Sequence, residues 1–448
     1  MVGASAVAVV GSGPAGFYTA AALLDSSDRT VRVDMFERLP TPWGLVRAGV
    51  APDHPKIKSV SAQYAKTASH PRFRFFGNVD VGRHVSRDDL LARYDAVVYT
   101  VGAQADRPLG IPGEDLPGSV AAVDFVGWYN GHPDFCNRSF DLKVRRAVVI
   151  GNGNVALDVA RILSTAPEQL AATDIADHAL EALRGSEIEE VVVVGRRGPA
   201  QAAFTTPELR ELREMTHAVV EVDSAEVGPV WNEESLPVTV RRNLEVLRGY
   251  AGQRESGGGR RILLRFQRSP VAILGGDRVE SVVLGRNELR TDGEGQVRAV
   301  DTGHREVVEA GLVLRAVGYR SVALPGVAFD ERRGLIPNRD GRIEGHQREY
   351  VAGWVKRGPS GIIGTNKRCA TETVKTLLAD LDAESRAAPP DEVERWLRQR
   401  QPQLVDLVGW AAIDAAERGA GECQGRPRVK LCTATTLIAA AVPRQPVL

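Results

Sequence analysis

Two segments of the chain share one arrangement of apolar residues and glycines. Residues 6–10 (AVAVV) are continuously apolar and run into GSGPAG at residues 11–16, and a helical pattern covers residues 17–24. Residues 147–150 (AVVI) run into GNGNVA at residues 151–156, and a helical pattern covers residues 157–163. An apolar run followed by a glycine-rich turn and a helix is typical of a buried parallel strand that opens a βαβ unit. Because each dinucleotide site needs its own sheet, the pattern predicts two Rossmann-like domains.

Further apolar runs extend both predicted sheets. They predict strands at residues 96–101, 191–194, 262–266, 279–284 and 312–317, and residues 164–189 form a helical insertion. The fold class is therefore α/β, with two dinucleotide-binding, three-layer domains. Proline-rich or glycine-bounded segments at 107–118 and 318–325 predict the two crossings between domains. The first domain is expected to comprise residues 1–106 plus 326–448 and the second residues 107–325, and residues 387–390 precede a mostly helical tail.

Composition excludes several classes of protein. The 448 residues carry 57 Lys and Arg against 57 Asp and Glu, which does not indicate a nucleic-acid-binding protein. The four cysteines form no CxxC pair and no cluster with metal-ligand spacing, so we expect no metal centre and no redox dithiol. The N-terminus enters a strand pattern at Ala6 without an export signal, and the late apolar run at 437–442 is too short for a membrane helix. These features predict a cytoplasmic protein without a membrane segment.

The first glycine motif predicts a site for a dinucleotide without a 2′-phosphate. Gly11 permits a tight turn, Gly13 lets a pyrophosphate approach the backbone, and Gly16 lets the helix pack on its strand. The strand at residues 31–36 ends in Glu37, whose carboxylate can accept hydrogen bonds from ribose hydroxyls and would repel a 2′-phosphate. The residues alone fit FAD or NAD.

The second motif predicts the opposite preference. It begins with Gly151 and Gly153, and the next strand leads to Arg196 and Arg197 where the first motif has an acid. Two guanidinium groups match a ribose 2′-phosphate and predict NADPH, although the same pair is also compatible with solvated loop charges. FAD in one domain and NADPH in the other predict hydride transfer from the nicotinamide to the flavin.

The segment from Leu39 to Lys56, LPTPWGLVRAGVAPDHPK, is much more specific than a glycine pattern. It resembles the adrenodoxin-reductase-like NADPH–ferredoxin reductases, especially the bacterial enzymes of mycobacterial type. Matching stretches continue at residues 73–79, 94–107, 111–115, 151–161, 195–212 and 354–367. The resemblance covers nearly the whole chain and implies a glutathione-reductase-like flavoprotein architecture and ferredoxin–NADP(+) reductase activity.

Carried over position by position, the resemblance also implies the contacts of each cofactor. The implied FAD contacts are Ala15, Glu37, Leu45, Val81, Trp354, Gly361, Ile362 and Ile363. The implied contacts of NADPH or NADP+ are Arg107, Asn152, Gly153, Asn154, Val155, Arg196, Arg197, Glu208 and Gly361. The segment 357–361 precedes a helical pattern, and a helix N-terminus there would stabilise negative charge on a reduced flavin.

Two titratable residues are candidate catalytic groups. The resemblance places His54 near the flavin, where it would either assist proton uptake or only orient a loop. Glu211 lies three residues after Glu208 on a helical pattern and would share its face. Because hydride transfer needs no general acid, the sequence leaves both roles open.

The electron acceptor is the least constrained part of the prediction. A disulfide reductase needs a cysteine pair near the flavin, which the sequence lacks. The resemblance implies that the acceptor is an acidic iron–sulfur ferredoxin and, indirectly, a downstream oxygenase. An NADPH-dependent flavin monooxygenase is the alternative. Arg241, Arg242 and Arg248 lie on a predicted helix and are candidates for ferredoxin docking, although an ordinary solvated helix face would look the same. The sequence does not specify the ferredoxin, the direction of electron flow or the oligomeric state.

Overall fold

The computed structural model describes residues 5–442 except 28, 229–232, 252–258, 294 and 383. Contacts within the chain divide it into two compact units. Unit 1 contains Met1–Ala105, Asn130–Cys136 and Tyr319–Leu448, and unit 2 contains Asp106–Tyr129 and Asn137–Gly318. Among the described residues, no helix is both long and apolar enough to cross a membrane.

The division differs from the predicted domain limits in three places, the first of which is Asp106, which begins unit 2. Residues 319–325 belong to unit 1, and the short segment Asn130–Cys136 leaves unit 2 to join unit 1. In that segment the Asn130 side chain accepts hydrogen bonds from Lys58 and Lys430, at 3.4 and 3.2 Å. Asp134 forms an ion pair with Arg38 at 2.6 Å. The segment has only seven residues, which are held by side-chain contacts to distant positions and have no periodic pattern of their own. The sequence therefore did not predict that this segment joins unit 1.

Unit 1 is built on a seven-stranded sheet in the order β16-β17-β18-β4-β1-β2-β3. The pairings of β18, β4, β1, β2 and β3 are parallel, and β16 and β17 are antiparallel additions at one edge. The strands are β1 (Ser5–Val10), β2 (Val31–Phe36), β3 (Phe73–Phe76), β4 (Ala96–Tyr99), β16 (Asn338–Arg339), β17 (Arg342–Ile343) and β18 (Glu349–Val351). A separate pair, β5 (Ala105–Asp106) and β15 (Tyr319–Arg320), lies where the chain passes between the units.

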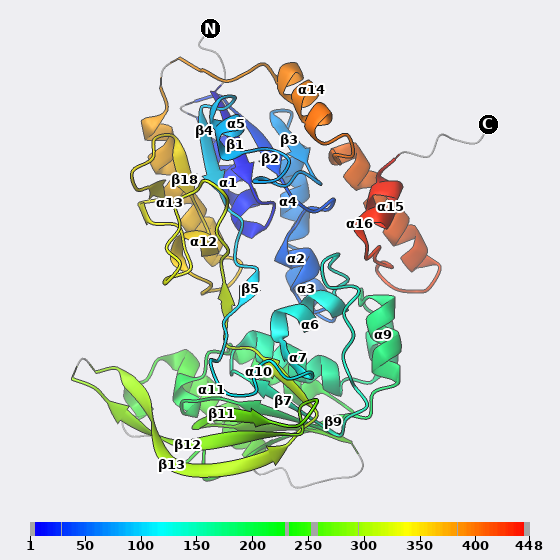
Figure 1. The fold of residues 1–448 in the computed structure, drawn as a ribbon, viewed down its shortest axis with the longest axis vertical. Helices are drawn as coiled ribbons and strands as arrows, with labels where there is room; N and C mark the ends of the chain where they lie inside the picture. The colour runs from blue at the N-terminus through cyan, green and yellow to red at the C-terminus, as the bar shows by residue number, and fades with distance from the viewer. Residues whose placement is uncertain are drawn as a thin grey trace. The chain divides into compact units, whose positions relative to one another are not determined.

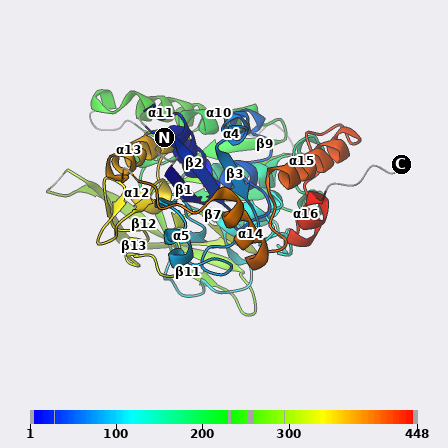
Figure 2. The ribbon, with the colours of Figure 1, turned by 90° about the horizontal axis from the view of Figure 1, so that it is seen from above.

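Helices cover both faces of this sheet. Alternate residues of β1 point to opposite faces, so Val7 and Val9 join one hydrophobic core and Ala6 and Ala8 the other. The first core packs against α1 (Pro14–Leu24), α4 (Ser61–Ala68) and α13 (Thr365–Asp380), of which α1 and α13 lie side by side (Figures 1 and 2). The second packs against α5 (Arg87–Leu91), α12 (Trp354–Arg357) and α14 (Pro390–Arg400). The result is the predicted three-layer unit.

The predicted helical tail is present in unit 1. After α14 come α15 (Leu407–Glu422) and α16 (Ala434–Ala441), which pack against each other. Two short helices belong to the family-specific segment 39–56. Helix α2 (Leu45–Ala48) lies within it, and α3 (Pro55–Lys58) begins at its end.

Unit 2 contains a six-stranded, all-parallel sheet in the order β6-β14-β7-β8-β10-β9. Its strands are β6 (Ser119–Ala121), β7 (Arg146–Ile150), β8 (Glu190–Val194), β9 (Ala218–Val222), β10 (Arg260–Arg265) and β14 (Leu312–Arg315). Its helices are α6 (Ala122–Tyr129), α7 (Asn154–Ser164), α8 (Pro167–Ala171), α9 (Asp177–Arg184), α10 (Thr206–Glu211) and α11 (Val238–Ala251). The predicted helical insertion at 164–189 thus corresponds to α8 and α9.

The third layer of unit 2 is an antiparallel sheet. Its strands are β11 (Arg268–Leu274), β12 (Ser281–Thr291) and β13 (Val297–Glu309), visible in the lower part of Figure 1. Val282, Leu284 and Val308 of this sheet share a core with Val148 and Val192 of the parallel sheet. The strand predicted at 279–284 therefore begins two residues later and is much longer, because its exposed half lacks the apolar run that the sequence pattern detects.

Candidate dinucleotide-binding sites

The carboxyl ends of the parallel strands in unit 1 converge on the first glycine motif. The turn begins at Gly11, whose φ of +104° is in the region that favours glycine. A Cβ on Gly16 would lie 2.1 Å from the Gly11 carbonyl oxygen, so only glycine allows α1 to approach the turn this closely. A Cβ on Gly13 would meet nothing within 4 Å. The turn therefore leaves its backbone open beside Gly13, as a bound pyrophosphate requires.

Glu37 follows β2 and faces this turn. Its Oε2 accepts hydrogen bonds from the backbone N–H and the hydroxyl of Ser12, at 3.0 and 2.7 Å. Its Oε1 accepts one from the Leu39 N–H at 3.0 Å. A carboxylate offers about four lone pairs, so Oε1 retains capacity for a ribose hydroxyl. The structure thus brings the predicted acid and the predicted glycines together.

The segment after β18 lies at the same carboxyl ends of the strands as the glycine turn. A Cβ on Gly353 would lie 2.5 Å from the Cβ of Ala15, which brings Trp354 next to the start of α1. The Trp354 Nε1 is buried without a hydrogen-bond partner among the described residues, and the Trp354 ring lies 5.6 Å from that of Tyr319. An orphaned indole N–H and an open glycine turn fit a bound cofactor with polar groups.

The remaining residues predicted around the flavin occupy three further segments of unit 1. Leu45 begins α2, Val81 is buried in the second core, and His54 is 7% exposed at the start of α3. Gly361, with a φ of +80°, and Ile362 lie in the turn before α13, where the Ile362 side chain is 63% exposed. Exposed apolar side chains beside the open turn would be covered by a bound ring.

Unit 2 repeats the arrangement of the turn. Gly151 has a φ of +132°, and a Cβ there would lie 2.2 Å from the Ala316 carbonyl oxygen. Gly153 has open space around it, with only the Ala203 Cβ, 4.0 Å away, within reach of an added Cβ. The Asn152 Nδ2 is buried without a hydrogen-bond partner in the described part of the chain. The Asn154 side chain accepts a hydrogen bond from the Thr205 N–H at 2.8 Å and so joins the start of α7 to the start of α10.

The two arginines after β8 are held by their backbone and not by acids. The Arg196 carbonyl accepts a hydrogen bond from Asn287 at 2.8 Å, and the Arg197 carbonyl accepts one from the Gln267 N–H at 3.1 Å. Arg196 is exposed and Arg197 half-buried. Neither guanidinium forms an ion pair with any residue that the structure describes. Most other arginines that the structure describes pair with acids, so the guanidinium groups of these two are available to bind an anion.

The other residues predicted in the second site also lie in unit 2. Glu208 is in the first turn of α10, and Glu211 ends that helix, 3.9 Å from Arg161. Arg107 is exposed, and its backbone N–H donates to the Gly318 carbonyl at 3.2 Å. Glu211 and His54, the two candidate catalytic groups, belong to different units.

Known proteins resemble the chain over nearly its whole length. Residues 5–217 match the family described as pyridine nucleotide-disulphide oxidoreductase. The NADPH-ferredoxin reductase FprA of Mycobacterium tuberculosis is 58% identical over 446 residues, which cover 96% of this chain and 98% of that protein. The chain belongs to the NADPH–ferredoxin reductase family. The mitochondrial NADPH:adrenodoxin oxidoreductase of Arabidopsis thaliana is 42% identical and covers 97% of the chain and 95% of its own length.

The solved structures agree with this membership. The structure of M. tuberculosis FprA in complex with NADPH superposes with a TM-score of 0.96 at 57% identity, covering 98% of this chain and 100% of that one. The resemblance drawn from segment 39–56 and the two-domain Rossmann-like fold are confirmed. The predicted class, an FAD- and NADP-dependent oxidoreductase, is confirmed at the level of the family.

Sequence reasoning missed several residues that shape the sites. Ser12 bonds to Glu37, and the single O–H of Thr100 lies within hydrogen-bond distance of the Val10 and Gly11 carbonyls, at 2.9 and 2.8 Å. Asn287 holds the Arg196 backbone from a strand more than 90 positions away. Ser12 lies inside the glycine motif and could have been noted there, whereas Thr100 and Asn287 act across strands and leave no local signal.

Proposed function

We propose that this chain is an NADPH–ferredoxin oxidoreductase that binds FAD in unit 1 and NADPH in unit 2. One observation carries the proposal: two similar glycine turns end in opposite charges. Beside the first, Glu37 is bonded to Ser12. Beside the second, Arg196 and Arg197 lack ion pairs in the part of the chain that the structure describes. An acid rejects a 2′-phosphate and unpaired arginines attract one, so the two sites would take different dinucleotides.

When bound, the two cofactors supply hydride transfer and the onward transfer of single electrons. The residues of the chain bind and orient them. The backbone beside Gly13 and Gly153 admits the pyrophosphates, and Trp354 closes the flavin site beside Ala15. All four cysteines are free in the structure. We assign the electrons to a separate acceptor, a ferredoxin, in accordance with the names of the relatives.

We further propose that His54 orients segment 39–56 and takes part in proton uptake on the flavin side. Its burial and its place at the start of α3 support a role close to the cofactor. Glu211 would act from α10, where its carboxylate lies 3.9 Å from the Arg161 guanidinium. The domain names also belong to the proposal: unit 1 would be the FAD-binding domain and unit 2 the NADPH-binding domain.

The predicted docking helix is α11. Arg241 and Arg242 are exposed on it. Arg248, in contrast, donates to both oxygens of Glu233 and to the Val227 and Gly228 carbonyls. Its donors are used within unit 2, so we propose docking of an acidic ferredoxin through Arg241 and Arg242 without Arg248. A downstream oxygenase as the final acceptor and a location in the cytoplasm stay predictions.

The test is NADPH-dependent reduction of cytochrome c, measured with and without a [2Fe–2S] ferredoxin. The proposal predicts a rate that depends on the ferredoxin and saturates with its concentration. A flavin monooxygenase would instead oxidise NADPH faster when an organic substrate is added, with oxygen inserted into that substrate and no dependence on ferredoxin. That outcome would replace the proposal with the alternative.

A further inference from the structure

A strained segment of unit 1 lies directly against the first glycine turn. Trp43 has a φ of +84°, which a side chain with a Cβ rarely adopts, and Gly44 follows with a φ of +50°. The Trp43 N–H donates to the Ser12 carbonyl at 3.1 Å, and a Cβ on Gly44 would lie 2.8 Å from the Gly13 Cα. Any movement of this segment would therefore change the opening beside Gly13. A strained backbone persists only where its surroundings fix it.

The helix α2 cannot fix the segment alone. It has only four residues, which is too short to be stable by itself. The centre of the Trp43 ring lies 4.7 Å from that of Phe17 of α1 and 6.0 Å from that of Trp410 of α15, which it meets edge-on. The Arg47 guanidinium lies 5.6 Å from the centre of the Trp410 ring. The C-terminal helix α15 thus supports both ends of the strained segment.

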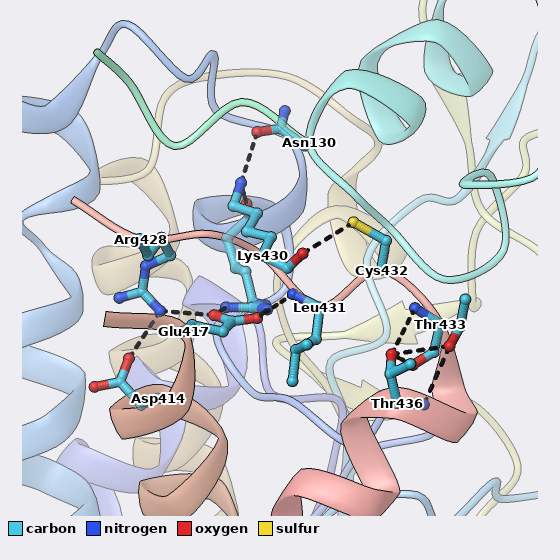
Figure 3. A network of polar contacts seen from close by, with 10 residues as sticks. Asn130, Asp414, Glu417, Arg428, Lys430, Leu431, Cys432, Thr433 and Thr436 are labelled. Atoms are coloured by element: carbon cyan, nitrogen blue, oxygen red, sulfur yellow. Dashed lines mark hydrogen bonds and ion pairs between the residues drawn. The ribbon is translucent and has the colours of Figure 1, made fainter. Parts of the chain in front are cut away.

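A buried carboxylate connects α15 to α2. Glu417 has a fully buried side chain and accepts from both terminal nitrogens of Arg47, at 2.8 and 2.5 Å. It also accepts from the Arg428 guanidinium and the Leu431 N–H, each at 2.9 Å (Figure 3). Four donors occupy the whole acceptor capacity of the carboxylate. Burial alone would raise the pKa of Glu417, but Arg47 and Arg428 outweigh it and hold the pKa below its usual value.

A second contact secures the other side of Arg47. Lys430 is 5% exposed, and its Nζ donates to the Arg47 carbonyl at 3.3 Å. The same Nζ donates to the Asn130 side chain at 3.2 Å (Figure 3). Both the guanidinium and the backbone of Arg47 are therefore bound by residues that follow α14. Surface ion pairs contribute little, but a buried carboxylate whose acceptors are all used, and which bonds an arginine with only 9% of its side chain exposed, fixes one geometry.

We propose that Glu417 is a positioning residue for the FAD site: through Arg47 it holds Trp43 and Gly44 against the glycine turn and so controls the release of the flavin. The inference rests on the proposed function in one respect, namely that unit 1 binds FAD. It goes beyond that function by giving the C-terminal helices a role in retaining the cofactor.

The test compares three variants of the full-length holoprotein. Glu417→Gln keeps the size and the acceptor for Leu431 but removes the charge that pairs with Arg47. Asp414→Asn is the matched control, because Asp414 lies on the same helix and bonds the same Arg428 at 2.8 Å, and no bond joins it to Arg47. The double variant Arg47→Met/Glu417→Gln also removes the guanidinium that the single variant leaves without the Glu417 carboxylate.

Two quantities are measured: the rate of FAD release, from the fluorescence increase on dilution, and the melting temperature with excess FAD. We expect Glu417→Gln to release FAD about ten-fold faster, the order expected for loss of a charge-assisted hydrogen bond, and to change the visible circular dichroism of the bound flavin. Asp414→Asn should behave as the wild type. In the double variant the melting temperature should recover while FAD release stays fast, because the ion pair between Glu417 and Arg47 (the bridge) is still absent.

Other outcomes overturn the proposal. If Glu417→Gln releases FAD at the wild-type rate, Glu417 does not act on the site. If FAD release recovers together with the melting temperature in the double variant, the bridge only stabilises the fold. A wild-type protein that binds no FAD would instead refute the proposed function, and the two failures are thus distinguishable. If Glu417→Gln does not fold, the double variant alone decides, since it still lacks the bridge.

Discussion

The preference for NADPH over NADH is the most direct test of the second site. We expect the double variant Arg196→Ala/Arg197→Ala to lose NADPH affinity and to keep its affinity for NADH. A charge-assisted hydrogen bond contributes about 1.5–3 kcal/mol. Arg196 is exposed, so solvent screening reduces its part toward the ~0.2–1 kcal/mol of a surface pair, whereas half-buried Arg197 retains more. With incomplete additivity, the expected loss is about 2–4 kcal/mol, or roughly 30- to 1,000-fold in Kd.

The assay is a titration of the full-length protein with NADP+ and with NAD+, followed by flavin absorbance or calorimetry. Arg278→Ala is the control. Arg278 is an exposed arginine beside the residues that begin β7 and β8, so it lies at the amino ends of the strands, whereas Arg196 and Arg197 follow the carboxyl end of β8. It should leave both affinities unchanged. An equal loss for NADP+ and NAD+ would refute the reasoning, since it would mean that the two arginines support the loop and do not bind the 2′-phosphate.

Three other predictions concern the first site, the docking surface and stability. Glu37→Arg should be purified without FAD, because the carboxylate that bonds Ser12 and would bond the ribose is replaced by a cation. The full visible absorbance of a bound flavin would contradict this. Arg241→Glu/Arg242→Glu should slow ferredoxin-dependent turnover and leave NADPH-dependent ferricyanide reduction intact. The wild-type rate with ferredoxin should fall with added salt, since screening limits the range of charge–charge interactions to about 8 Å at an ionic strength near 0.15 M. Because the folded pKa of Glu417 is lowered, its contribution to stability is present above the unfolded value of about 4.3 and is lost as the pH falls through the folded pKa. The difference in unfolding free energy between the wild type and Glu417→Gln should therefore shrink below about pH 4, and a difference that grows there would contradict the ionised state.

Local patterns sufficed for the elements that open each unit. The apolar run at 6–10 and the run at 147–150 became β1 and β7, and each glycine motif became the turn into α1 or α7. These predictions succeeded because a buried parallel strand and a phosphate-binding turn each depend on residues that are consecutive in the sequence. The strand predicted at 279–284 was placed less well, because the outer half of β12 pairs with β13 in solvent and needs no apolar residues.

The candidate site divides in the same way. The charges of Glu37, Arg196 and Arg197 follow their strands directly, so position in the chain was enough to locate them. The sequence could not show that Arg248 is bound to Glu233, because both are ordinary charged residues until the helix brings them together. It therefore grouped Arg248 with two arginines that remain exposed.

The chain by itself determined two dinucleotide turns, the opposite charges beside them and the family, because each depends on residues that are neighbours in sequence. Only the tertiary structure decided that Asn130–Cys136 joins unit 1, that Asn287 holds the loop of Arg196, and that Glu417 reaches Arg47 across 370 positions. Such contacts depend on burial, because a charged group is buried at low cost only where it is paired with a partner. Which residue becomes the partner depends on how the chain packs and not on any local periodicity.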